Sequence, residues 1–302
     1  MAKKLRRRTF LQTLGSAAVV SALPGIVKAQ AKRVAVFRET EPPWRHEFDF
    51  SLSGPLTFLT EQELIARLNA RDFDLFINPY GGAFPRLAFN VILKFLQDGG
   101  NWLNLGGVPL SVPMLRSRSG GWPTLPYQTA FHKRLGITHF FPVEGRKIVK
   151  YQSAHEELSR NFKADVVFEL YVRLSSTSNE PDEAGSDGPH EGVVEPLVSG
   201  LNAEGRAIAA PIIQIDRHQG EFKGGRWIFA NFGGSLTANA VKFLIDRASQ
   251  GAVRFRVRSD FACYRAGEVP AISVEGVNSY NVEVRDPSGQ VIRDLKQIVK
   301  PG

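Results

Sequence analysis

The stretch FDLFINPYGGAFPRLAFNVILKFLQDGGNWLNLGG, residues 73–107, decides the fold of this chain. Its first apolar run, residues 73–78, predicts a buried strand that ends in Pro-Tyr-Gly-Gly. Pro85 can open the next segment, whose apolar pairs recur every four residues up to a Gly-Gly pair, which is typical of an amphipathic helix. Residues 102–105 predict a second buried strand before another Gly-Gly pair. Strand, helix and strand at this spacing indicate a βαβ unit.

The sequence on both sides extends the same alternation. Residues 34–37 form a short apolar run, and Thr60 with Glu63 forms a capping box ahead of helical spacing. Residues 208–215 and 227–232 are two further apolar runs, and the second is followed by an amphipathic helix. We therefore expect an α/β fold with a doubly wound, mainly parallel, flavodoxin-like sheet over residues 31–251.

After Gly251 the pattern changes to the period of two that is typical of strands. Residues 252–302 therefore predict a β-rich, immunoglobulin-like segment. Fifty residues make only about half of such a sandwich, because a whole domain needs about 100. Two alternatives follow: a small β appendage on the main domain, or a second domain inside which the chain stops. The second is favoured.

The first thirty residues resemble a twin-arginine export signal. The pair Arg7-Arg8 is followed by Phe10-Leu11, an apolar run, and small residues near position 30. The resemblance implies passage of the folded protein through the twin-arginine translocation machinery, cleavage near residue 30, and a periplasmic or secreted product. The alternative is an N-terminal membrane anchor, although an apolar run of about 13 residues is short of the ~20 needed to cross a bilayer. Membrane association is expected only if the signal stays uncleaved.

Charge and cysteine content narrow the classes of partner. Residues 1–29 hold six of the 38 basic residues and none of the 30 acidic ones. Without this segment the net charge of the chain falls from +8 to +2. Nucleic acid is therefore not an expected partner, because backbone binding needs a clustered basic surface. The single cysteine, Cys263, excludes an internal disulfide and a cysteine-based zinc site.

Several groups that can bind a ligand follow the first three predicted strands. In a parallel sheet these strand exits lie at one edge, where open α/β folds bind ligands. The charged and aromatic loop after residue 37 and the two glycine turns would meet there, roofed by the segment after the third strand. The expected set is Glu39, Trp44, Tyr80, Gly81, Gly82, Gly106, Gly107, Gln128 and His132. Carboxylates beside an aromatic face suit a carbohydrate. The alternative is that the glycine turns are strand exits without a ligand.

The pattern of strand, Pro-Tyr-Gly-Gly, helix and Trp-Leu-Asn-Leu-Gly-Gly resembles the class I glutamine amidotransferase-like fold. The resemblance is to the variant that accompanies secreted carbohydrate-active proteins of the β-galactosidase type, and it covers roughly residues 32–250. In the active family a cysteine stands in a G-x-C-x-G elbow. Here the matching exit, Leu105 to Val108, has no nucleophile, and Cys263 falls outside the region. The resemblance therefore implies a shared scaffold without glutamine hydrolysis.

No other motif predicts catalysis, a metal or a cofactor. The sequence lacks G-x-G-x-x-G and the phosphate-loop pattern, and its six histidines form no ligand pair at helical spacing. Gly-x-Ser-x-Gly is also absent, so Ser111 is interpreted as a loop serine. The main hypothesis is an exported, non-catalytic module for carbohydrate binding or for assembly of a carbohydrate-processing protein. The alternative is a glycoside hydrolase, or an N-terminal fragment of one.

Overall fold

The chain divides into two units, residues 31–252 and residues 1–30 together with 253–302. The computed structural model describes residues 17–21, 32–118, 120–137, 139–144, 147–158, 166–171, 192–218, 220–231, 236–252, 256–259, 272–275, 279–285 and 291–298. Among these residues, no helix combines the length and the hydrophobicity needed to cross a bilayer.

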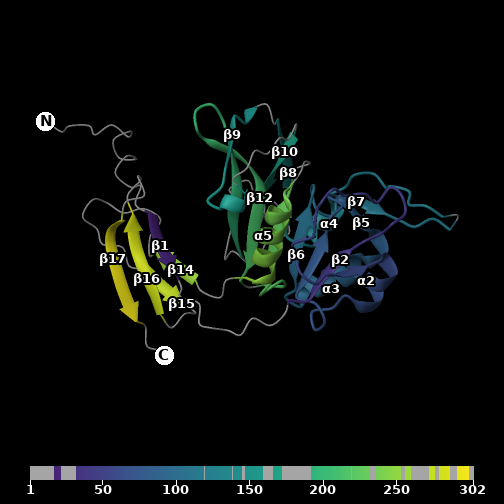
Figure 1. Ribbon diagram of the computed structural model, residues 1–302, viewed down its shortest axis with the longest axis horizontal. Helices are drawn as coiled ribbons and strands as arrows, with labels where there is room; N and C mark the ends of the chain where they lie inside the picture. The colour runs from purple at the N-terminus through teal and green to yellow at the C-terminus, as the bar shows by residue number, and fades with distance from the viewer. Residues whose placement is uncertain are drawn as a thin grey trace. The chain divides into compact units, whose positions relative to one another are not determined.

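The unit of residues 31–252 is built on a mixed sheet of eight strands in the order β3-β2-β4-β6-β13-β12-β11-β9 (Figure 1). The strands are β2 (Val34–Phe37), β3 (Thr57–Leu59), β4 (Leu75–Asn78), β6 (Asn101–Leu105), β9 (Lys150–Gln152), β11 (Gly192–Leu201), β12 (Ala207–Arg217) and β13 (Arg226–Ala230). From β3 to β13 every neighbouring pair is parallel, whereas β12, β11 and β9 join as antiparallel strands. The predicted α/β fold with a mainly parallel sheet is confirmed.

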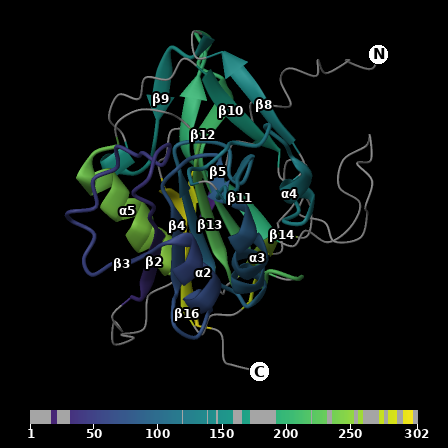
Figure 2. The same ribbon diagram turned by 90° about the vertical axis from the view of Figure 1, so that its right-hand side faces the viewer.

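Helices cover both faces of this sheet, as Figure 2 shows for α5 on one side and α3 on the other. The helical segments are α2 (Glu61–Arg67), η1 (Arg86–Ala88), α3 (Phe89–Gln97), α4 (Ala130–Lys133), η3 (Glu156–Leu158) and α5 (Ala238–Ser249). One apolar core lies between the sheet and α2 and α3, and a second lies between the sheet and α5.

Successive side chains of β2 pack alternately into the two cores. Ala35 and Phe37 belong to the core beneath α2 and α3, whereas Val34 and Val36 belong to the core beneath α5. All four side chains are buried. A strand buried on both faces has no polar side, which is why the parallel strands are continuous apolar runs in the sequence.

Local signals place the helix ends, with one correction. The predicted capping box begins α2: the Glu63 N–H donates to the Thr60 hydroxyl, and the Thr60 N–H donates to the Glu63 carboxylate at 2.9 Å. Pro85 does not begin the next helix as predicted. It ends β5 (Ala83–Pro85), which pairs with β7 (Val112–Met114), and α3 starts only after the turn η1.

The remaining strands form small sheets. In the same unit β8 (His139–Glu144) pairs with β10 (Val166–Tyr171). In the other unit the strands are β1 (Ala17–Ser21), β14 (Arg256–Ser259), β15 (Ile272–Glu275), β16 (Ser279–Arg285) and β17 (Val291–Ile298). They pair as β1-β16-β17 and as β14-β15. The immunoglobulin-like arrangement stays a prediction, as does the export signal within which β1 lies.

Candidate functional site

The exits of β2, β4 and β6 lie side by side at the carboxyl edge of the sheet. These three strands are adjacent and parallel, so the residues that follow each strand meet there. The Tyr80 hydroxyl spans two exits: it donates to the Glu39 carbonyl and accepts from the Glu39 N–H, both at 3.2 Å. Glu39, Tyr80 and both glycine turns therefore share one edge.

Two buried asparagines hold the glycine turns in place. Asn78 ends β4 and Asn104 lies beside it in β6. The Asn78 Nδ2 donates to the Asn104 Oδ1 at 3.0 Å, and both amides donate to the Gly81 carbonyl. The Asn104 Nδ2 also donates to the Gly107 carbonyl at 2.9 Å. Buried amides need such partners, so the network fixes one turn against the other.

The glycines are required by contact between the two turns. A Cβ on Gly81 would lie 2.5 Å from the Gly106 carbonyl oxygen, and one on Gly82 would lie 2.2 Å from the Ser111 Oγ. The Gly81 N–H also donates to the Leu105 carbonyl at 2.8 Å. Backbone therefore fills the space between the β4 and β6 exits, where the sequence suggested room for a ligand.

Trp44 is a packing residue of this edge. Only 5% of it is exposed. Its ring centroid lies 4.9 Å from that of Phe37, 5.0 Å from that of Tyr80 and 5.1 Å from that of Trp122, all in edge-to-face contacts. Such contacts stabilise a core. The Trp44 face is not open as a platform for a sugar.

The two residues expected to roof the edge differ in exposure. His132 is 1% exposed, and its Nε2 contacts the Pro109 carbonyl. Burial lowers the pKa of His132 below its ordinary value, so the ring is neutral at neutral pH. Gln128 is partly exposed, and its N–H donates to the Ser111 carbonyl at 2.9 Å. His132 is thus a core residue, and Gln128 alone of the two faces solvent.

A row of half-buried rings lies over the exits. His46 belongs to the charged and aromatic loop that was expected at this edge, whereas Phe48 and Phe50 were not expected there. His46, Phe48 and Phe50 come from the loop after β2, and the Phe48 ring lies 3.2 Å from where a Gly106 Cβ would stand. The His46 ring stacks on Phe48 at 6.2 Å and meets Tyr80 edge-on at 5.4 Å. Burial and the charge of Arg38 lower the pKa of His46. The row offers aromatic faces and a neutral imidazole to a ligand.

Two further polar groups at this edge could not be found from local pattern. Glu61 is 5% exposed, and its Oε1 has no hydrogen-bond partner. Burial, and then the charge of Glu39, raise the pKa of the Glu61 carboxyl. Asn231 follows β13 at 1% exposure, and neither end of its amide is hydrogen-bonded. The capping box explained Glu61 as a helix residue, and a lone asparagine after a strand gives no signal.

Replacing Glu61 or Glu63 of α2 by glutamine should change the stability at pH 7 in opposite directions. A raised folded pKa means that stability falls as pH rises through it, so Glu61→Gln should be more stable than wild type at pH 7 and similar near pH 4. Two hydrogen bonds from Thr60 lower the pKa of Glu63. Stability from Glu63 is therefore present at pH 7 and lost in acid, so Glu63→Gln should be less stable at pH 7. Thermal melts of both variants from pH 4 to pH 8 measure this, and shifts of the same sign would contradict it.

Neither a nucleophile nor a metal cluster is found at this edge in the described part of the chain. The Ser111 hydroxyl is buried and donates to the Val108 carbonyl at 2.8 Å. Cys263 lies outside the described residues. No group of three or more His, Cys, Asp or Glu side chains among the described residues could hold a metal ion. Three cavities that are lined by described residues contain none of the expected site residues.

Comparison with known proteins gives distant structural neighbours. No family model matches the sequence, and no curated protein matches it. A GH42 β-galactosidase from G. stearothermophilus is 12% identical to this chain, with a TM-score of 0.40. The matched region covers 89% of this chain and 40% of the β-galactosidase chain. A cold-adapted β-galactosidase from Rahnella is 11% identical over 88% of this chain and 39% of its own, with a TM-score of 0.41.

A shorter neighbour matches over most of its own length. It is a ThuA-like protein from Bacteroides uniformis, 13% identical, which covers 75% of this chain and 94% of its own with a TM-score of 0.35. The present chain spans about 40% of the length of the β-galactosidases. Similarities at this level say nothing about activity.

Proposed function

We propose that this chain is an exported, non-catalytic, amidotransferase-like α/β module that binds a carbohydrate or supports assembly in a carbohydrate-processing system. The observation that supports this proposal most is that backbone of a neighbouring turn packs against the end of β6. The sequence resemblance points to enzymes with a cysteine at that turn, whereas here the turn is Gly106-Gly107, packed against Gly81. The single cysteine of the chain, Cys263, lies outside residues 31–252.

The neighbouring side chains do not replace that nucleophile. Ser111 is 2% exposed and its hydroxyl is bonded to a backbone carbonyl, so it has no route to a substrate. Glycoside hydrolysis needs two carboxyls that flank the scissile bond. Glu39 and Glu61 are close enough to interact, but the Glu39 carboxylate accepts from the Glu61 N–H at 3.0 Å and the Glu61 carboxyl is buried. This pair supports a structural role over a glycosidase role.

Two parts of this proposal, the link to carbohydrates and the export, are supported by the sequence alone. The resemblance over residues 32–250 supplies the first, and Arg7-Arg8 followed by Phe10-Leu11 supplies the second. Export is tested by the compartment in which the chain accumulates when both arginines are replaced by lysine. Within the carboxyl edge, the half-buried His46, Phe48 and Phe50 are the rings that a sugar could contact, since Trp44 is enclosed.

Activity assays on the full chain test the non-catalytic proposal. Release of ammonia from glutamine and of nitrophenol from nitrophenyl β-galactoside should not exceed a blank without protein. The reason is that the described residues at the exits present no reachable nucleophile or carboxyl pair. Glu39→Gln and Ser111→Ala serve as matched variants, because each keeps the size of the side chain approximately. Turnover by the wild type that either variant abolishes would refute the proposal and favour the hydrolase alternative.

A further inference from the structure

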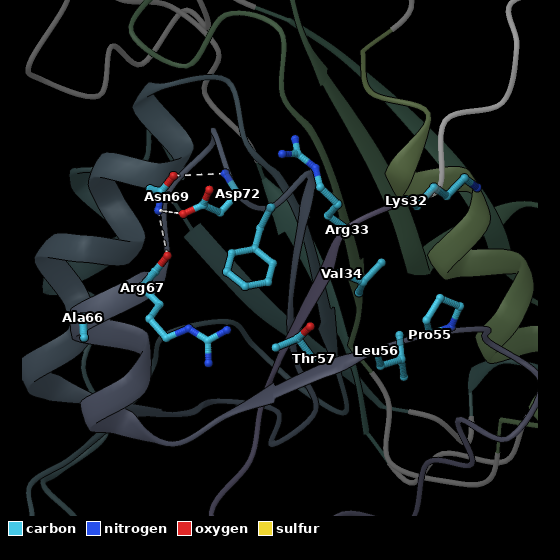
Figure 3. Close-up of a pocket in the computed structure, with 11 residues that line it drawn as sticks. Lys32, Arg33, Val34, Pro55, Leu56, Thr57, Ala66, Arg67, Asn69 and Asp72 are labelled. Carbon is cyan, nitrogen blue, oxygen red and sulfur yellow. Dashed lines mark hydrogen bonds between the residues drawn. The ribbon is translucent and has the colours of Figure 1, made fainter.

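A hollow of about 470 Å³ lies at the amino edge of the sheet, away from the exits described above (Figure 3). Its walls are the start of β2, the edge strand β3, and the end of α2 with the loop that leads to β4. The volume falls within the ~300–1,000 Å³ typical of small-molecule sites. A ligand of monosaccharide size fits such a space.

The hollow combines an apolar wall with a basic rim. Val34, Pro55, Leu56 and Phe73 contribute the apolar part. Three of its four charged lining residues are basic, namely Lys32, Arg33 and Arg67, and the fourth is Asp72. Apolar surface with a few placed polar groups is the usual composition of a ligand site.

Two of the three basic side chains are already neutralised. Arg33 lies 2.6 Å from the Asp74 carboxylate, and Lys32 lies 3.1 Å from that of Asp246. The Arg33 Nε and backbone N–H also donate to Asp74, so this pair is fixed by three hydrogen bonds. Neither cation is free to neutralise a ligand.

Arg67 is the cation that remains. Within the described part of the chain its guanidinium has no hydrogen bond and no ion pair. Its charge helps to lower the pKa of Glu63 on the same helix, after the hydrogen bonds from Thr60, to which the Glu63 carboxylate is bonded. Figure 3 shows the Arg67 side chain reaching into the hollow on the side of Thr57, whose hydroxyl also faces it. An arginine in the last turn of a helix also stabilises it through the helix dipole. That role would not require a hollow with a hydroxyl beside the arginine.

Asn69 holds this arrangement rigid. Its Nδ2 donates at 2.8 Å to the Arg67 carbonyl and at 2.8 Å to the Asp72 carboxylate, as the dashed lines in Figure 3 show. Its Oδ1 accepts from the Arg71 and Asp72 N–H groups, both at 3.0 Å. The backbone from which Arg67 projects is therefore fixed before a ligand arrives, which reduces the entropy cost of binding.

We propose that this hollow binds a hydroxy-carboxylate of monosaccharide size, such as a uronate. The carboxylate would pair with the fork of the Arg67 guanidinium, and a ring hydroxyl would bond to the Thr57 hydroxyl. One uncommitted guanidinium matches one negative charge, whereas a phosphate dianion would call for a second free cation. The inference does not depend on the proposed function, because it concerns the opposite edge of the sheet.

Calorimetric titration of the full chain with sodium glucuronate tests the site, with glucose and inorganic phosphate as comparators. Glucuronate should bind in low salt, and glucose should bind at least about tenfold more weakly because it lacks the charge. Arg67→Gln should weaken glucuronate binding roughly 10- to 100-fold, the range for hydrogen bonds to charged groups. Thr57→Val should weaken it several-fold.

Arg71→Gln is the matched control. Arg71 is an exposed arginine of the adjacent loop that does not line the hollow, so its loss removes the same charge and should change binding less than about twofold. Equal weakening by both substitutions would reduce the effect to general charge and overturn the site. So would an Arg67→Gln variant that binds like wild type, or a wild type that binds no glucuronate. Tighter binding of phosphate than of glucuronate would overturn the assignment to a carboxylate.

Discussion

Asp216→Ala should destabilise the unit of residues 31–252 by about 3–5 kcal/mol. Asp216 and Arg226 face each other across β12 and β13, and their side chains are 7% and 3% exposed. The Arg226 Nε and Nη2 donate to the two Asp216 oxygens at 2.6 and 2.9 Å. Without the carboxylate, the partners left to the buried guanidinium among the described residues are the Arg247 carbonyl at 3.1 Å and the Gln250 side chain at 3.5 Å. Urea unfolding of the variant measures the loss.

Two comparisons separate this effect from ordinary loss of charge. Glu41 pairs with Arg116 at 2.7 Å, but both side chains are over 40% exposed, so Glu41→Ala should cost less than about 1 kcal/mol. The double variant Asp216→Leu, Arg226→Met should recover most of the loss, because an apolar pair of similar volume leaves no buried charge. A loss for Asp216→Ala as small as that for Glu41→Ala would contradict the prediction.

The parallel half of the sheet could be predicted because its signals are local. The apolar runs of β2, β4 and β6 are each shorter than a helix and bounded by Gly, Pro or polar residues. The Thr60–Glu63 capping box placed the start of α2 to the residue. Each of these features depends on neighbours within a few positions, so one sequence suffices to find them.

The antiparallel half and the packing of the edge depend on distant partners. β11 pairs with β12 in antiparallel direction, but an apolar run does not indicate whether a strand is parallel or antiparallel to its neighbour. Pro85 has the local signature of a helix start, yet the pairing of β5 with β7 takes it into a strand. Trp44 lies in a charged loop that predicts exposure, whereas its contact with Trp122 buries it. Tertiary contact overrode the local pattern at each position.

The glycine turns show the same limit in the candidate site. Glycine after a strand permits either a close ligand or a close backbone, and the sequence does not distinguish them. The structure brings Gly81 against Gly106, two residues that belong to different strand exits. These glycines therefore lie at the expected edge, with a packing role that only the contact between the turns reveals.

Gly81→Ala should destabilise the same unit by about 2–5 kcal/mol. Gly81 has a φ of 62°, and forcing a side chain into that region costs about 1–2 kcal/mol. The added Cβ would also stand 2.5 Å from the Gly106 carbonyl oxygen, which is backbone held by the β6 exit and cannot rotate away. Overpacking adds about 1–3 kcal/mol. Thermal and urea unfolding measure the sum.

Gly54→Ala is the control that isolates the backbone term. Gly54 has a φ of 77° and nothing within 4 Å of its Cβ position, so its substitution should cost only the ~1–2 kcal/mol of left-handed strain. The difference between the two variants then measures the clash between the turns. If Gly81 instead made room for a ligand, Gly81→Ala would match Gly54→Ala in stability and lose binding. Equal stabilities of the two variants would thus return the β4–β6 exit to the ligand site that the sequence suggested.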